Sequence, residues 1–170
     1  MTEERQLMDQ AIKVMTDKGG KYLSFSLAEE EYGIGILKVK EIIGMMNITV
    51  IPKTPEFVKG VINLRGKVIP VIDLRLKFDM PSVDFTERTC IIVVEVDSAG
   101  GTLMIGIVVD SVSEVLNVRA ENIEPPPSFG AGLDTGYILG MAKMEGGVKI
   151  LLDINNVLGA DEIAGLEKVS

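Results

Sequence analysis

The chain contains an internal repeat, and no other feature of the sequence limits its possible folds as strongly. Residues 32–43 are matched by residues 105–116 at a shift of 73, and residues 60–74 are matched by residues 140–154 at a shift of 80. In the first block, Tyr32-Gly33-Ile34 with Val39, Glu41, Ile42 and Ile43 matches Ile105-Gly106-Ile107 with Val112, Glu114, Val115 and Leu116. In the second block, Gly60, Gly66, Val68, Asp73 and Leu74 match Gly140, Gly146, Val148, Asp153 and Ile154. Chance similarity between apolar hairpins is the alternative, and the shared order of the two blocks argues against it.

The repeat predicts two copies of one unit with four or five strands each. A unit of roughly 70 residues makes a small barrel that is closed or nearly closed, which removes exposed sheet edges. Two such units can pack about a pseudo-twofold axis, and both copies of the Val-x-Glu-Ile/Val segment could reach the groove at their seam. The copies differ at one hairpin tip, where Arg65 precedes Gly66 but Glu145 precedes Gly146. This difference indicates that one copy is specialised.

Alternating apolar residues between Gly and Pro turns predict a chain of short strands. The expected strands are 22–27, 32–36, 60–65, 68–74, 89–96, 103–109, 137–144 and 148–154. Residues 37–43 are predicted to form a short helical turn. Residues 1–20 are either a tail or a short helix, and the same two interpretations stay open for residues 160–170.

Composition excludes several classes of function. The net charge of −8 argues against the cationic surface that binds nucleic acid, and no run of Lys and Arg suggests a local basic patch. The chain has no histidine and a single cysteine, Cys90, so the usual general base and a cysteine metal cluster are both missing. No apolar stretch approaches the ~18 residues that a membrane-spanning helix needs. We therefore expect a cytosolic protein that binds no metal or cofactor and does not insert into the membrane.

Motifs of catalysis fail on spacing or chemistry. Residues 60–67 resemble a phosphate-binding loop but have one residue too many between the glycines, and Val68 replaces the hydroxyl that would hold magnesium. Cys90 begins an apolar strand, which favours a buried, inert thiol over a nucleophile. The sequence therefore predicts a protein that is not an enzyme.

The motifs Gly60-Val61-Ile62-Asn63-Leu64-Arg65-Gly66, Ile69-Pro70-Val71-Ile72-Asp73-Leu74-Arg75, Glu31-Tyr32-Gly33-Ile34 and Gly106-Ile107-Val108-Val109-Asp110-Ser111-Val112 resemble the CheW family. The likeness covers about residues 21–159. It implies a mainly β fold of two SH3-like five-stranded barrels, with sequence halves of about 21–78 and 88–158, an apolar core between them and strands exchanged between barrels.

The same resemblance implies a scaffold or adaptor that couples chemoreceptors to the CheA histidine kinase and is recruited from the cytoplasm to receptor arrays. The implied partners are the cytoplasmic tip of chemoreceptors, the regulatory domain of CheA and other copies of the chain. The implied receptor-binding residues are Val39, Glu41, Ile42, Arg65, Val112 and Val115, and the implied kinase-binding residues are Gly60 and Glu41.

Each of these residues also has a plainer interpretation. The four aliphatic side chains could be core, Glu41 and Arg65 could be solvated surface charges, and Gly60 could serve only an unusual backbone angle. A free-standing fragment of the kinase, a β-barrel enzyme and a small-ligand binder are the alternative classes of protein.

Overall fold

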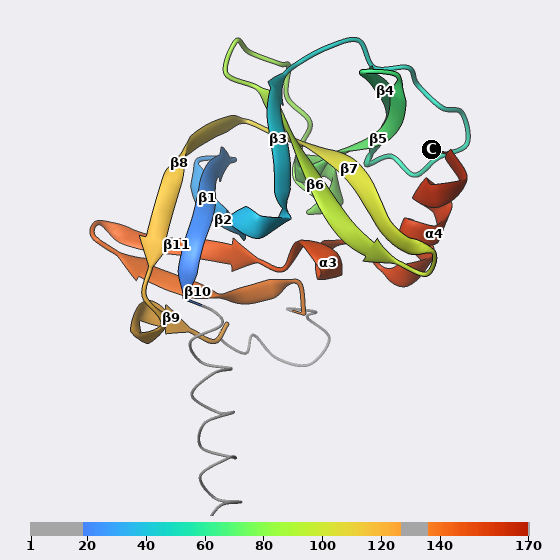
Figure 1. Cartoon of the computed structure of the whole chain (residues 1–170). Coiled ribbons are helices and arrows are strands. Elements are labelled where there is room, and N and C mark those ends of the chain that lie inside the picture. The colour runs from blue at the N-terminus through green and yellow to red at the C-terminus, as the bar shows by residue number, and fades with distance from the viewer. Residues whose placement is uncertain (1–18, 127–135, 170) are drawn as a thin grey trace, which may run out of the picture.

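The computed structural model describes residues 19–126 and 136–169, and most of this part of the chain is β-structure (Figure 1). The first half supplies β1 (Gly20–Leu27), β2 (Glu30–Gly35), β3 (Val39–Gly44), β4 (Val58–Leu64) and β5 (Lys67–Asp73). The second half supplies β6 (Cys90–Ser98), β7 (Gly101–Val109), β8 (Ser111–Val118), β9 (Ile123–Glu124), β10 (Ile138–Met144) and β11 (Gly147–Leu152). The helical elements are η1 (Ile36–Lys38), α2 (Leu74–Lys77), η2 (Ala120–Asn122), α3 (Ile154–Val157) and α4 (Ala160–Val169). The predicted N-terminal tail or helix lies outside the described residues, apart from its last two glycines.

The strands form two sheets, and the first hairpin of each half of the chain lies in the sheet formed mainly by the other half. One sheet has the order β8-β1-β2-β11-β10-β9, and the other has the order β3-β6-β7-β5-β4. Hairpin β1–β2 of the first half therefore lies between strands of the second half, and hairpin β6–β7 lies between strands of the first. Because each half completes the sheet of the other, neither half contains a whole sheet of its own.

The pairing registers follow both shifts of the sequence repeat. In the parallel pair of β5 and β7, Val71 lies opposite Gly106, and in the parallel pair of β11 and β2, Leu151 lies opposite Gly33. The shift of 80 relates Val71 to Leu151, and the shift of 73 relates Gly33 to Gly106. The antiparallel pairs β3–β6 and β8–β1 each contain a register shift, which falls between Val39 and Glu41 in β3 and between the matching Val112 and Glu114 in β8. The prediction of a mainly β fold with internal duplication is confirmed.

Two local predictions differ from the structure. The sheets contain six and five strands, because the short β9 pairs with β10, whereas its counterpart in the first half is an isolated bridge from Thr49 to Val61. The predicted helical turn at residues 37–43 is wrong, since only Ile36–Lys38 is helical and Val39 begins β3. The run Val-Lys-Glu-Ile-Ile is rich in β-branched residues that fit a half-covered strand, and pairing with β6 decides its conformation.

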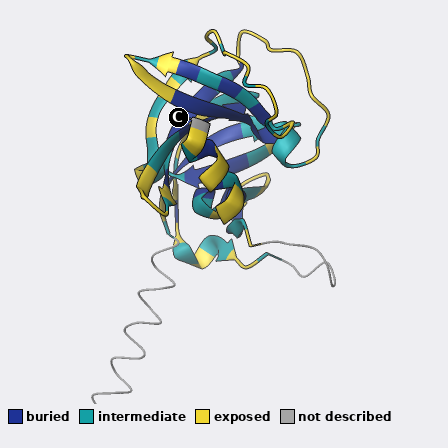
Figure 2. Cartoon of the chain, turned by 90° about the vertical axis from the view of Figure 1, so that its right-hand side faces the viewer, coloured by how far each residue is buried: buried dark blue, intermediate teal, exposed yellow. Residues whose placement is uncertain are grey.

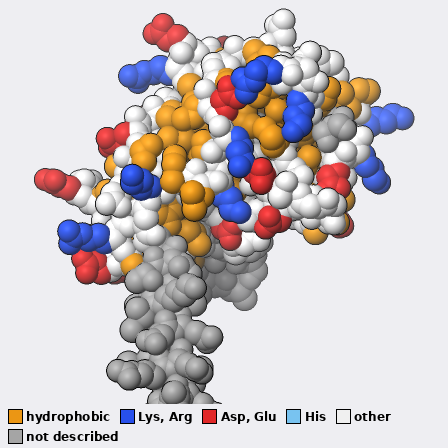
Figure 3. Space-filling model, in the orientation of Figure 1, with side chains coloured by type: hydrophobic (Ala, Val, Ile, Leu, Met, Phe, Trp, Pro, Cys, Tyr) orange, Lys and Arg blue, Asp and Glu red, His pale blue; other side chains and the backbone are white. Residues whose placement is uncertain are grey.

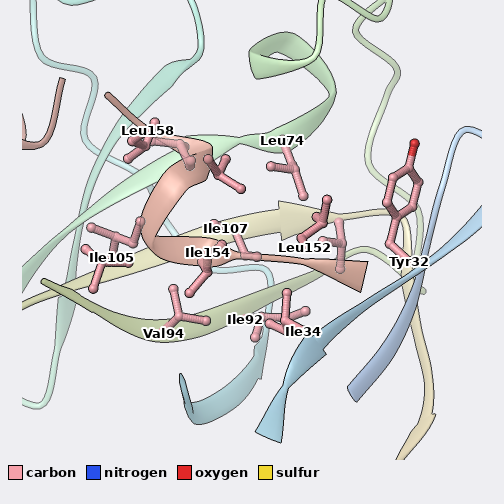
Figure 4. Packing of buried hydrophobic residues seen from close by; sticks show 14 of the residues in the cluster. Tyr32, Ile34, Leu74, Ile92, Val94, Ile105, Ile107, Leu152, Ile154 and Leu158 are labelled. Carbon is pink, nitrogen blue, oxygen red and sulfur yellow. The ribbon is translucent and has the colours of Figure 1, made fainter. Parts of the chain in front are cut away.

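Both sheets contribute to one shared apolar core. Side chains from β2, β6, β7 and β11 converge there with those of α3, as Figure 4 shows. Along β6, Ile92 and Val94 face this core, whereas Ile91 and Val93 face a separate cluster of the five-stranded sheet. Buried residues fill the interior and exposed residues mark the hairpin tips and the outer side of α4 (Figure 2). Successive residues of one strand thus serve two cores, which is why this strand is a continuous apolar run.

The C-terminal helix α4 is attached to this core. Its side chains Ile163 and Leu166 are buried in the shared cluster. Lys77 Nζ donates to both carboxylate oxygens of Glu162 at 2.8 and 2.7 Å, and the N–H of Gly159 donates to Oε1 at 2.8 Å. Burial alone would raise the pKa of Glu162, but these hydrogen bonds outweigh it and lower the pKa.

Candidate interaction surface

Arg65 and Glu41, which the sequence assigns to partner binding, form an ion pair with each other. Glu41 lies in the edge strand β3, and Arg65 lies at the tip of the β4–β5 hairpin. Arg65 Nη1 donates to Glu41 Oε1 at 2.9 Å, and Nη2 donates to Oε2. The five-stranded sheet therefore curves until its edge strand reaches the hairpin on its opposite side.

The Arg65–Glu41 pair is open to solvent. The side chain of Arg65 is 71% exposed. The hydrogen bonds from Arg65 lower the pKa of Glu41, and the same contact raises the pKa of Arg65. An exposed pair contributes little to stability, but two-point pairing fixes both side chains in one plane. The pair therefore holds a guanidinium and a carboxylate in a fixed position at the surface.

The tip that carries Arg65 is a tight turn with an unusual backbone. Arg65 has φ 52° and Gly66 has φ 84°, the left-handed pair that a two-residue hairpin of this type requires. The N–H of Gly66 donates to Asn63 Oδ1 at 2.8 Å, which stabilises the turn. Asn or Asp is the usual residue at the first of these positions, so the sequence places an arginine there at a cost of about 1–2 kcal/mol.

Gly60 has a backbone role in the structure. Its φ is 140°, and a Cβ atom built there would lie 2.0 Å from the carbonyl oxygen of Thr49. Thr49 and Val61 exchange two backbone hydrogen bonds of 2.8 and 2.9 Å beside it. In the second half, a Cβ on Gly140 would meet Ile123 at 2.5 Å. Both glycines allow an outer segment to approach the hairpin, and kinase contact at Gly60 stays a prediction.

The four predicted aliphatic residues divide into two types. Val39 and Val112 are half-buried and pack against the shared core. Ile42 and Val115 are exposed, at 43% and 51%. These residues lie on β3 and β8, the corresponding edge strands of different sheets, so strand pairing does not join them into one cluster. Hydrophobic side chains gather on the surface between β8 and β3 (Figure 3).

A second ion pair, which the sequence did not assign to a site, fixes the start of β8. Arg75 donates to Asp110 through Nε at 2.8 Å and Nη2 at 2.6 Å, and the N–H of Ala28 donates to the same carboxylate at 2.9 Å. Burial would raise the pKa of Asp110, but these hydrogen bonds lower it. The pair joins α2, the β1–β2 turn and β8 at the junction of the halves. Both residues belong to the sequence motifs quoted above, which was the available signal.

Within ranges 19–126 and 136–169, no group of three or more Cys, Asp or Glu side chains could hold a metal ion. Cys90 is half-buried and its Sγ lies 3.2 Å from the carbonyl oxygen of Arg88. An open cavity of about 630 Å³ lies between the β6–β7 turn and α4, where Asn155 Oδ1 accepts from the N–H of Asp97 at 2.9 Å. No helix in this part of the chain is long and apolar enough to cross a membrane.

A duplicated β-scaffold with aliphatic edge strands and a charged rim defines a class of interaction domain. The model of the CheW-like domain matches residues 21–162, and the chain belongs to this family. A chemotaxis protein CheW of Klebsiella aerogenes is 45% identical over 89% of both chains. One from Rhizobium meliloti is 32% identical over 91% of this chain and 97% of its own. The crystal structure of scaffolding protein TtCheW from Thermoanaerobacter tengcongensis superposes with a TM-score of 0.74 at 39% identity, covering 85% of this chain and 95% of that one.

Proposed function

We propose that this chain is a non-catalytic scaffold that couples chemoreceptors to the CheA histidine kinase. The single observation that carries the proposal is the Arg65–Glu41 pair, which holds a charged rim beside the exposed aliphatic edge of β3. The family and its relatives named for chemotaxis support the same assignment. The proposed place of action is the cytoplasmic face of receptor arrays.

The receptor contact follows from the shape of the proposed partner. A receptor tip is a helical hairpin, and an apolar stripe on a helix packs well against exposed aliphatic side chains. A residue such as Ile42 or Val115 adds ~1–2 kcal/mol to such a contact before ordering costs are subtracted, so each contact by itself is weak. Flanking charges fix the register of such a contact more than its affinity.

The kinase contact is proposed through the resemblance of folds. The regulatory domain of CheA shares the duplicated barrel of this family, so two such modules can meet through corresponding ends. Glu41 and the hairpin shaped by Gly60 are the proposed kinase-facing residues. Weak contacts to receptor, kinase and further copies of the chain suit an array, because multivalency supplies the net avidity.

The test is receptor-dependent kinase activation with an Arg65→Asp variant. Aspartate tolerates the left-handed backbone at position 65 better than arginine does, so the variant should fold with an unchanged circular dichroism spectrum. We expect it to lose activation in a reconstituted assay of receptor fragment and kinase. Arg119→Asp, which makes the same charge change at another exposed site, is the matched control and should activate normally. Full activation by Arg65→Asp would remove Arg65 from the proposed surface.

A further inference from the structure

The two halves of the molecule present the same exposed apolar positions. Ile42 and Val115 are related by the shift of 73 and are 43% and 51% exposed. Val68 and Val148 are related by the shift of 80 and are 47% and 49% exposed. We take these exposed aliphatic side chains, which lie on edge strands β3 and β8 and on β5 and β11 near the hairpin tips, as two related docking faces, one in each half of the scaffold.

The charges beside these two faces differ. In the first half, Arg65 satisfies Glu41 by two hydrogen bonds. The matching residues of the second half are Glu114 on β8 and Glu145 at the tip of the β10–β11 hairpin, and both are exposed. Among the described residues, neither carboxylate takes part in an ion pair.

The strand pairing around Glu114 and Glu145 repeats the strand pairing around Glu41 and Arg65. Strand β8 pairs with β1 as β3 pairs with β6, and hairpin β10–β11 has the register of hairpin β4–β5. The tip itself is built differently, because Glu145 lies outside the left-handed region and is followed by Gly146 at φ 90°. Glu114 and the β10–β11 hairpin therefore occupy the places that Glu41 and the β4–β5 hairpin have in the first half, and only the backbone of the turn differs.

We propose that Glu114 and Glu145 receive a cationic side chain, an arginine or lysine, from the chemoreceptor tip. The first half supplies the template, since there a guanidinium contacts the carboxylate of the edge strand. The exposed Val115 and Val148 would contact aliphatic residues beside that cation. This inference rests on the proposed function and adds the chemistry of the partner at the β8 face.

The decisive variant is Glu145→Arg. It places a guanidinium where the first half has one, so an intramolecular pair with Glu114 replaces the partner's cation and a positive charge repels it. We expect its affinity for a purified receptor cytoplasmic fragment, measured by calorimetry, to fall about tenfold or more. Glu114→Gln should weaken binding about threefold and reduce its salt dependence. Glu87→Arg, the same charge change in the loop before β6, should bind like the wild type.

Each outcome decides between the ideas. If the wild type does not bind the receptor fragment, the proposed function fails. If the wild type binds and Glu145→Arg binds equally well, the function stands and the cation site is wrong. If Glu145→Arg instead alters sedimentation of the chain alone, the occupant is a second copy and the receptor assignment is wrong. A crystal structure of the variant should show the new guanidinium on Glu114, and a guanidinium pointing away would overturn the geometry.

Discussion

Replacing Gly60 by alanine should destabilise the protein because of the backbone around it. A Cβ at this position would lie 2.0 Å from the carbonyl oxygen of Thr49, and the φ of 140° is one that side chains rarely adopt. The strained backbone costs about 1–3 kcal/mol. Displacing Thr49 also breaks its two hydrogen bonds to Val61, worth about 0.5–1.5 kcal/mol each. We therefore expect a loss of about 3 kcal/mol, a large part of the ~5–15 kcal/mol of a typical domain.

Urea unfolding followed by circular dichroism measures this loss. At the usual slope of ~1–3 kcal/mol per molar for urea, the midpoint of Gly60→Ala should fall by about 1–3 M. Two matched glycines provide controls. A Cβ in Gly140→Ala would lie 2.5 Å from Ile123 Cγ2 and 3.1 Å from the carbonyl oxygen of Glu124, but the backbone there is outside the left-handed region, so this variant should lose less. Gly44→Ala meets no atom within 4 Å, so it should stay within about 0.5 kcal/mol of the wild type.

The contrary result is informative about function. If Gly60→Ala unfolds at the wild-type midpoint but no longer binds the regulatory domain of CheA, the reasoning from backbone geometry is refuted. Gly60 would then act at the partner surface itself. A loss of stability with binding retained by the folded fraction would leave Gly60 a structural residue.

Three further predictions concern the core, the stability of the fold at acid pH and the exposed edge strand β8. Ile92→Ala should cost about 2–5 kcal/mol in urea unfolding, whereas Ile42→Ala on the exposed edge should cost under about 0.5 kcal/mol; equal losses would contradict the described burial. The folded pKa of Asp110 is lowered, so its stabilisation is complete above its ordinary value of 3.8 and is lost as the pH falls below it. Asp110→Asn should reduce the loss of unfolding free energy at acid pH, and an unchanged pH profile would show that the Arg75 pair is unimportant. Val115→Asp should reduce receptor binding with little change in the urea midpoint, and a large drop in midpoint would place Val115 in the core.

Repetition in the sequence was sufficient to predict the doubled β fold. Because β-turns demand glycine at fixed places, the matched glycines at Gly66 and Gly146 recorded the hairpins of both halves. The exchange of hairpins follows from the family resemblance and not from the repeat. Sheets with exchanged hairpins and sheets without them would show the same repeat in the sequence. Residues 37–43 were misassigned because their strand depends on pairing with β6, which is distant in the sequence.

The candidate site was only partly accessible to sequence reasoning. Glu41 and Arg65 were each predicted as contact residues, but their mutual ion pair depends on the curvature of a whole sheet. Likewise, Val39 and Ile42 are alike in sequence, and the register shift after Val39 places them opposite Val94 and Ile92 on one face of the sheet; Val39 packs against the shared core there, whereas Ile42 is exposed at the sheet edge. Simple alternation along the strand would have put these two side chains on opposite faces, so the register shift could not be predicted from the pattern.

The most direct test of the scaffold proposal is sedimentation of the kinase with receptor-bearing vesicles. The account predicts that CheA pellets with the vesicles only when this chain is added, and that the amount saturates with the chain in stoichiometric proportion. Kinase that pellets equally well without the chain, or that stays in the supernatant with it, would contradict the account.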